Sequence, residues 1–223
     1  MDFILSLRCS ITYNLHVSFN NIQAACMQQR ETRRSNRERS DATRTAILDA
    51  ARALFVSRGY AETATPDIVA AAGLTRGALY HHFEDKKALF RAIVEREARE
   101  VAAMIEQLAG APLPPREALL AGAAAYFDAM AVPGRVRLLL LDGPAVLGVT
   151  EMAALDAAHG GRTLEEGLAA AMAPHRLEEK TVKAMAFLLS AAFDRAALEI
   201  DAGAARADYA YAIDRLIDRL IAQ

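Results

Sequence analysis

Proline, glycine and threonine between residues 65 and 75 constrain the fold of this chain more than any other feature of its sequence. Thr65 precedes Pro66, and a threonine cap followed by proline at the first helical position is a strong signal for a helix start. Gly73 stands where the left-handed residue that closes a helix belongs, because glycine has no side-chain penalty at positive φ. Thr75 then caps a second helix. The segment predicts two short helices separated by a tight turn.

A third helix is needed beside this pair, because two helices this short cannot bury enough surface on their own. The segment from about Asp41 to Arg58 provides it, and Gly59 closes it. Its apolar residues recur at spacings of three and four, namely Ile47, Leu48, Ala51, Leu54 and Phe55. In the second short helix, Leu79 and Phe83 form the buried stripe. These helices predict a helix-turn-helix unit, whose second helix enters the major groove of DNA, about 12 Å wide.

The chain resembles the TetR/AcrR family of transcriptional regulators over about 50 residues of this region. The residues that match the family signature at its fixed spacing are Leu54, Phe55, Gly59, Tyr60, Thr63, Thr65, Ile68, Ala72, Gly73, Gly77, Leu79, Tyr80, His82, Phe83, Lys86 and Leu89. Val69 replaces a usual alanine and Ala64 interrupts a usual threonine pair, and neither change is expected to alter the fold. The resemblance implies an all-α protein, a homodimer in the cytoplasm that represses transcription from a palindromic operator until a small-molecule effector releases it.

The resemblance also implies which side chains touch DNA. It places Thr65, Tyr80, His82 and Lys86 at positions that contact phosphates, and Arg76, Gly77, Ala78 and His81 near base edges. Arg76 is the strongest candidate, because a guanidinium bonds O6 and N7 of guanine together and discriminates by about 1–3 kcal/mol. Two alternatives stay open: Tyr80 as half-buried packing and His82 as a structural histidine. His81 and His82 point about 100° apart on a helix, so neither a metal nor a cofactor is expected.

Charge is concentrated ahead of this unit. The whole chain has a net charge of −2, but residues 27–44 carry six arginines against three acidic residues. Such a polar run is expected to be disordered when free, as part of an N-terminal extension over residues 1–40. One interpretation is a solvated tail, and the other is an arm that follows phosphates or enters the minor groove.

Residues 1–26 have no helical period and resemble neither a signal peptide nor a membrane span. We interpret them as upstream sequence with Met27 as the natural initiator, which leaves open whether they belong to the native protein. Cys9 and Cys26, the two cysteines of the chain, both lie here. No disulfide framework is implied, and a reduced cytoplasm fits.

The rest of the chain is rich in alanine and leucine and is predicted to be helical throughout. We expect a DNA-binding domain over residues 41–87 and a helical effector-binding and dimerisation domain over residues 88–223. Asp85 caps a long helix that runs to about Leu108. The further helices expected are 115–131, 135–141, 149–158, 162–173, 178–201 and 205–222, with Asp142, Gly143 and Pro144 stopping the second of these.

Apolar stripes on the last two helices predict a dimer interface made by four helices. They consist of Ala184, Phe187, Leu188, Ala191 and Ala192 on one helix and Tyr209, Ile213, Leu216, Ile217 and Leu220 on the other. The alternative is that these stripes pack only inside one subunit. A dimer also suits DNA binding, since one short recognition helix buries too little surface for selectivity.

Candidates for an effector pocket are mostly large side chains of the middle helices. They are Tyr126, Phe127, Met130, Met152, His159, Met172, Phe187, Phe193 and Asp194. Most could equally be ordinary core, and Asp194 could face solvent or a dimer partner instead of a ligand.

Three classes of function remain after these observations. The first is a DNA-binding regulator that responds to a ligand. The second is a regulator or architectural DNA-binding protein that answers to no effector, and the third, a remote alternative, is an enzyme with an appended DNA-binding module. The sequence contains no nucleophile–base set, phosphate-binding glycine loop or metal-ligand spacing, so we expect that the protein is not an enzyme.

Overall fold

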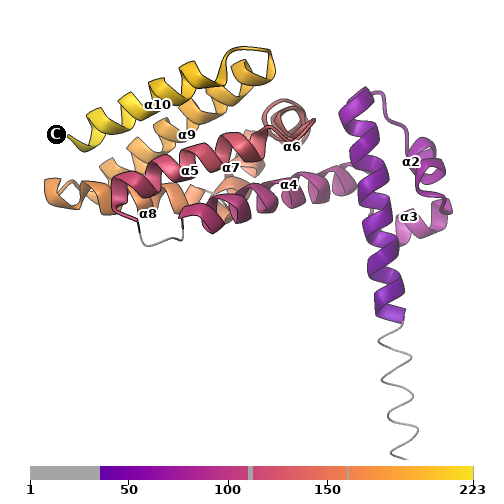
Figure 1. Cartoon of the computed structure of the whole chain (residues 1–223). Helices are drawn as coiled ribbons and strands as arrows, with labels where there is room; N and C mark the ends of the chain where they lie inside the picture. The colour runs from indigo at the N-terminus through magenta and orange to yellow at the C-terminus, as the bar shows by residue number, and fades with distance from the viewer. Residues whose placement is uncertain (1–35, 110–112, 160, 223) are drawn as a thin grey trace, which may run out of the picture. The chain divides into compact units, whose positions relative to one another are not determined.

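Helices dominate the residues that the computed structural model describes, which are 36–109, 113–159 and 161–222 (Figure 1). The α-helices after residue 60 are α2 (Thr65–Ala72), α3 (Arg76–His82), α4 (Lys86–Ala109), α5 (Pro115–Met130), α6 (Gly143–Leu147), α7 (Val149–His159), α8 (Gly161–Met172), α9 (Glu179–Asp201) and α10 (Arg206–Ile221). A π-helical segment, η1 (Arg137–Asp142), precedes α6, and a 3₁₀ turn, η2 (Ala173–His175), follows α8. The predicted all-α class is confirmed. In the described part of the chain, no helix is both long and apolar enough to cross a membrane.

Residue 46 ends the first of two compact units of the chain. Within that unit residues 36–46 are helical. The predicted helix start near Asp41 was therefore at least five residues late, and the disorder predicted up to residue 40 is wrong for residues 36–40. The hydroxyl of Thr43 donates to the carbonyl of Arg39, and Arg37 lies 3.9 Å from Asp41 one turn away, which supports helix here. Our interpretations of Met27, Cys9, Cys26 and the arginines up to residue 34 lie outside the described residues.

The second unit begins with a helix over residues 47–58, which packs with α2 and α3 around a shared core. Phe55, Ile68 and Leu79 supply one buried side chain from each helix. Phe90 from the first turns of α4 joins them, its ring 5.3 Å from that of Phe55. The same apolar cluster continues along α4 into η1 and α6. The three-helix unit therefore rests on α4 rather than standing apart from it.

The predicted signals between the short helices are largely confirmed. Gly59 and Gly73 adopt φ of 88° and 65°, and Thr75 caps α3 with its hydroxyl oxygen 3.2 Å from the amide of Ala78. The predicted cap at Thr65 is wrong: the extended residue before α2 is Ala64, and Thr65 is already helical. The helix starts one residue earlier because Pro66 is tolerated at the second position of the first turn, where its missing N–H costs nothing.

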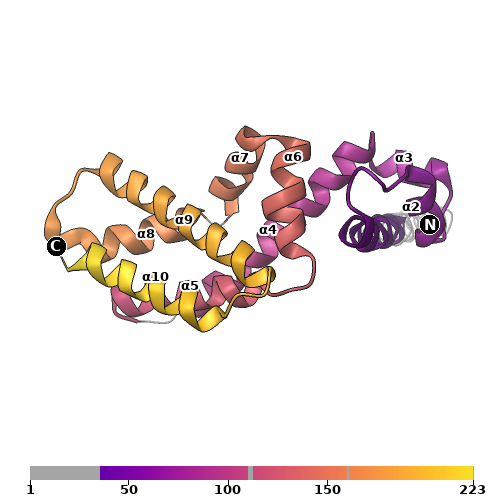
Figure 2. The same cartoon turned by 90° about the horizontal axis from the view of Figure 1, so that it is seen from above.

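A second apolar cluster fills the space between α5, α8, α9 and α10. Helix α9 packs against both α8 and α10, and α10 runs beside α5 (Figure 2). Phe127, Leu168, Phe193 and Ile217 are buried there, one from each helix. The predicted helices 115–131, 149–158, 162–173, 178–201 and 205–222 each match an observed helix to within one or two residues.

The predicted stop at residues 142–144 is wrong. The chain passes from η1 directly into α6, and Pro144 occupies its first turn. Gly143 is buried where a side chain would lie 2.8 Å from the carbonyl oxygen of Leu138 and 3.0 Å from Met152. Glycine therefore serves close packing here, and proline serves a helix start, so neither interrupts the helix.

Candidate nucleic-acid interface and effector cavity

Helix α3 has one face anchored in the core and the other open to solvent. Leu79 is 1% exposed and Phe83 is 5% exposed, whereas Arg76, Gly77 and His81 are exposed. Thr75 caps the N-terminus of α3, so Arg76 and Gly77 form its first turn, where both are exposed. In a helix-turn-helix, this end of the second helix meets base edges.

The predicted DNA-contacting residues fall into two groups. Arg76 and Tyr80 stack on the exposed face, with the guanidinium carbon 5.4 Å from the centre of the phenol ring and Tyr80 42% exposed. His81 is exposed as well, and its ring lies 5.2 Å from that of His82. Thr65, Ala78 and His82 are half-buried. Of the predicted set, Arg76, Gly77, Tyr80 and His81 are therefore the most accessible.

Lys86 is engaged with the protein itself. Its ammonium donates to the carbonyl oxygens of Tyr60 at 3.0 Å and Thr63 at 3.1 Å, and it lies 4.2 Å from the centre of the Tyr60 ring. An ammonium has three donors, so one remains for a phosphate. The structural role of Lys86, which ties the start of α4 to the turn before α2, was not foreseen from the sequence.

Lys86→Met is expected to lower the free energy of unfolding by about 1–3 kcal/mol, because two carbonyls lose a charged hydrogen-bond donor. Urea unfolding followed by circular dichroism measures this. The adjacent, exposed Lys87 provides the control, and Lys87→Met should change stability far less. Equal stability of the two variants would contradict the assigned role.

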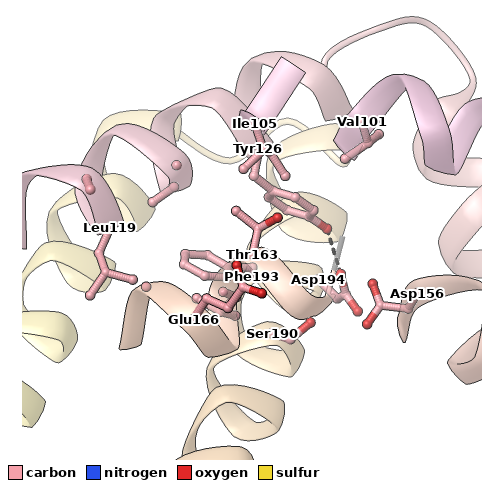
Figure 3. Close-up of a pocket in the computed structure, with 15 residues that line it drawn as sticks. Val101, Ile105, Leu119, Tyr126, Asp156, Thr163, Glu166, Ser190, Phe193 and Asp194 are labelled. Atoms are coloured by element: carbon pink, nitrogen blue, oxygen red, sulfur yellow. Dashed lines mark hydrogen bonds between the residues drawn. The ribbon is translucent and has the colours of Figure 1, made fainter. Parts of the chain in front are cut away.

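A cavity of about 280 Å³ opens between α4, α5, α7, α8 and α9 (Figure 3). Its lining consists of Val101, Ile105, Ala118, Leu119, Gly122, Ala123, Tyr126, Asp156, Thr163, Leu164, Glu166, Gly167, Ser190, Phe193 and Asp194. Three predicted residues line this cavity, Tyr126, Phe193 and Asp194, and the hydroxyl of Tyr126 donates to Asp194 Oδ1 over 2.6 Å. The walls are mainly aliphatic and aromatic, with Asp194 and Asp156 together on one side.

The other predicted pocket residues lie elsewhere. Phe127 and Met130 line a separate cavity of about 260 Å³, beside Arg206. Met172 is core, at 2% exposure, and Met152 packs against the first cluster. His159 is half-buried and lies outside the lining of both cavities.

Phe187 was the clearest error among the pocket candidates. It is 72% exposed, because it lies on the face of α9 opposite the buried Leu189 and Phe193. Sequence reasoning also missed Asp156, which reaches the cavity from α7. A carboxylate within the alanine-rich run of residues 153–158 was the available signal.

The environment of the cavity raises the pKa values of three groups that line it. Burial raises the pKa of Asp194, the hydrogen bond from Tyr126 opposes this, and the neighbouring charge of Asp156 adds to the rise. Burial likewise raises the pKa of Asp156. Burial followed by the charge of Asp194 raises the pKa of Tyr126, so that phenol stays protonated. Of the three carboxyl groups that line the cavity, those of Asp194 and Asp156 are therefore costly to ionise together.

These features define a class of protein: a helix-turn-helix DNA-binding regulator with a helical second part that encloses a small-molecule-sized cavity. Two family profiles match this chain. "Bacterial regulatory proteins, tetR family" matches residues 47–93, and "Tetracyclin repressor-like, C-terminal domain" matches residues 116–223. The chain belongs to the TetR family of bacterial regulatory proteins, whose members bind DNA operators and typically act as dimers with effector ligands.

Individual curated relatives each match only part of the chain. The chain is 45% identical over 64 residues to the transcriptional repressor BepR of Brucella suis, covering 29% of this chain and 30% of that protein. It is 33% identical over 96 residues to the transcriptional activator FasR of Mycolicibacterium smegmatis, covering 43% and 44%. The chain thus spans less than half the length of these curated relatives.

A solved structure covers more of the fold. A TetR-family transcriptional regulator from Pectobacterium atrosepticum aligns with a TM-score of 0.63 and 28% identity, covering 83% of this chain and 95% of that one. The similarity therefore extends beyond the helix-turn-helix to the cavity-bearing helices.

Proposed function

We propose that this protein is a homodimeric repressor that binds a palindromic operator through α3 and releases it when a small molecule enters the cavity beside Tyr126. The observation that carries the proposal is the two-sided character of α3. Its apolar side is fixed in the core while Arg76, Gly77, Tyr80 and His81 stand free on the other. Such a regulator acts in the cytoplasm, where bacterial DNA lies.

Base recognition is assigned to Arg76. The guanidinium is exposed at the first position of α3 and is held over Tyr80, which limits its freedom before DNA arrives. Gly77 supports a close approach of the helix, because the nearest atom to a side chain built there is Thr75 Oγ1 at 3.9 Å. The fold itself therefore leaves room for a larger residue, and a DNA backbone lying against the helix would explain glycine.

Release by a small molecule is assigned to the main cavity. Its lining joins α4 to α5, α7, α8 and α9, and α4 also supports the three-helix unit through Leu89, Phe90 and Ile93. A ligand that changes the position of α4 at Val101 and Ile105 would therefore change the position of α3 as well. Ligand binding would be coupled to DNA release if the ligand binds more tightly to one position of α4 and the operator to the other.

DNA selection with the purified protein tests the proposal, and a palindrome with two equal half-sites is the expected result. Arg76→Ala should then cost about 1–3 kcal/mol at one base position in each half-site and relax the preference there. Lys87→Ala removes one positive charge from an exposed site outside α3, so any effect on binding should be the same for all sequences. An Arg76 variant with unchanged sequence preference would refute the assignment.

A further inference from the structure

The cavity combines an apolar interior with an acidic side. Aliphatic side chains from α4 and α5 and the rings of Tyr126 and Phe193 form most of the wall. Figure 3 shows the carboxyl groups of Asp194 and Asp156 close together on one side, with the hydroxyl of Ser190 nearby. A volume of about 280 Å³ lies just below the usual range of ligand sites, roughly 300–1,000 Å³.

The two aspartates lack a positive partner among the described side chains. Asp194 accepts one hydrogen bond, from the neutral phenol of Tyr126, and neither carboxylate forms an ion pair within the described part of the chain. Asp194 is half-buried and Asp156 lies exposed at the rim of the cavity. Partial removal of a carboxylate from water disfavours its charge, and a nearby cation offsets this cost. Burial is the main reason why the pKa of both carboxyl groups is raised, and the neighbouring charge of Asp156 adds to the rise at Asp194.

A cation in the cavity would offset both the desolvation of the carboxylates and the repulsion between them. An ammonium N–H donates to carboxylate oxygens, and the Ser190 and Thr163 hydroxyls offer further acceptors. The face of the Tyr126 ring adds an attraction for positive charge. The apolar walls would bury the hydrocarbon body of the same molecule.

We infer that the effector of this protein is an organic monocation, a small amphiphile whose ammonium group lies between Asp194 and Asp156 while its apolar body fills the space lined by Val101, Ile105, Leu119 and Phe193. The inference rests on the proposed function, because it names the ligand class of the cavity through which release is proposed. It separates this chain from a regulator tuned to fatty acids or other anions, which two adjacent carboxylates would repel.

Three probes with one apolar body and different head charges test the ligand class: 4-phenylbutylammonium, 4-phenylbutanol and 4-phenylbutanoate. Isothermal titration calorimetry with the full-length protein at neutral pH should show the ammonium binding at least about tenfold more tightly than the alcohol, as expected for a partly desolvated ion pair. The carboxylate should bind most weakly. Equal affinities, a preference for the carboxylate, or no ammonium binding at millimolar concentration would overturn the inference.

Asp194→Asn should reduce ammonium affinity about tenfold and leave alcohol affinity unchanged, because it removes charge while its amide oxygen still accepts the bond from Tyr126. Asp156→Asn, on the exposed rim, serves as a second variant if Asp194→Asn fails to fold. Glu106→Gln removes one charge from an exposed site outside the lining and should bind like the wild type. Unchanged ammonium affinity in both aspartate variants would also overturn the inference.

Operator binding measured in parallel by fluorescence anisotropy separates this inference from the proposed function. Intact operator binding without a preference for the ammonium would refute only the ligand class. Ammonium binding to a protein that binds no operator, or that keeps its operator when saturated, would refute the proposed function and leave the ligand class standing.

Discussion

Glu97→Ala is expected to lower the free energy of unfolding by about 3–5 kcal/mol, since it removes the buried carboxylate that Arg52 and Arg135 share and leaves Arg135 with Glu100 as its remaining ion-pair partner. Glu97 is 1% exposed on α4. It accepts hydrogen bonds from Arg52 Nε at 2.7 Å and from Arg135 Nε at 2.8 Å. Arg135 is itself only 3% exposed, so its charge has little access to water once Glu97 is gone.

The position of this network makes the effect cooperative. Arg52 belongs to the helix over residues 47–58, Glu97 to α4, and Arg135 to the segment between α5 and η1. Arg135 also donates to the carbonyl of Ala129 at 2.9 Å. Removing the carboxylate therefore loosens the attachment of the three-helix unit at one point, in addition to the local cost.

Urea unfolding at a fixed protein concentration measures the change. Glu95→Gln, on the same helix, is the control, because Glu95 lies 3.9 Å from Arg91 at a partly exposed site where ion pairs contribute about 0–1 kcal/mol. A Glu97→Ala variant as stable as Glu95→Gln would show that the buried network contributes little.

The ion network around Glu97 also predicts that the stability of the protein depends on pH. Burial alone would raise the pKa of Glu97, but the hydrogen bonds from Arg52 and Arg135 outweigh it and lower that pKa. A lowered pKa in the folded state means that the stabilisation is present above the pKa of the unfolded chain and is lost as pH falls through the folded value. Glu97→Gln should therefore flatten the acid limb of the stability curve.

Phe187→Glu is expected to convert the protein to a monomer and to weaken operator binding by about 10²–10⁴, the usual gain from linking two binding modules. Phe187 and Leu188 on α9 are 72% and 68% exposed, and Tyr211 and Leu216 on α10 are 67% and 49% exposed. Exposed apolar side chains gathered on adjacent helices mark an interaction surface. A second copy of the chain is the proposed occupant, and two-fold symmetry would place each new charge in the interface twice.

Light scattering after size exclusion and anisotropy with operator DNA measure the two consequences. Val149→Glu is a matched control, because Val149 is 77% exposed on α7, away from α9 and α10. It should leave both assembly and operator binding unchanged. A dimeric Phe187→Glu variant with wild-type operator affinity would place the interface elsewhere.

The features predicted best from the sequence were helix starts and ends, which depend on residues close together in the chain. Gly73 and Thr75 close and open helices through their own backbone preference and side-chain oxygen, so their roles were predicted without knowledge of distant residues. Asp85 was predicted as the cap of α4 for the same reason, and its carboxylate accepts the amide of Ala88 at 2.6 Å. Gly143 failed as a local signal because buried contacts, rather than a turn, explain the glycine there.

The sequence by itself determined the helical class and the helix-turn-helix, because each depends on residues within a few turns of one another. Only the tertiary structure decided the cavity, the ion network and the exposure of Phe187. Asp156 and Asp194 come from α7 and α9, and Arg52 and Arg135 meet at Glu97 across more than 80 residues of chain. Helical periodicity identifies a face but not the neighbour it packs against, and charge pairing and burial depend on that neighbour.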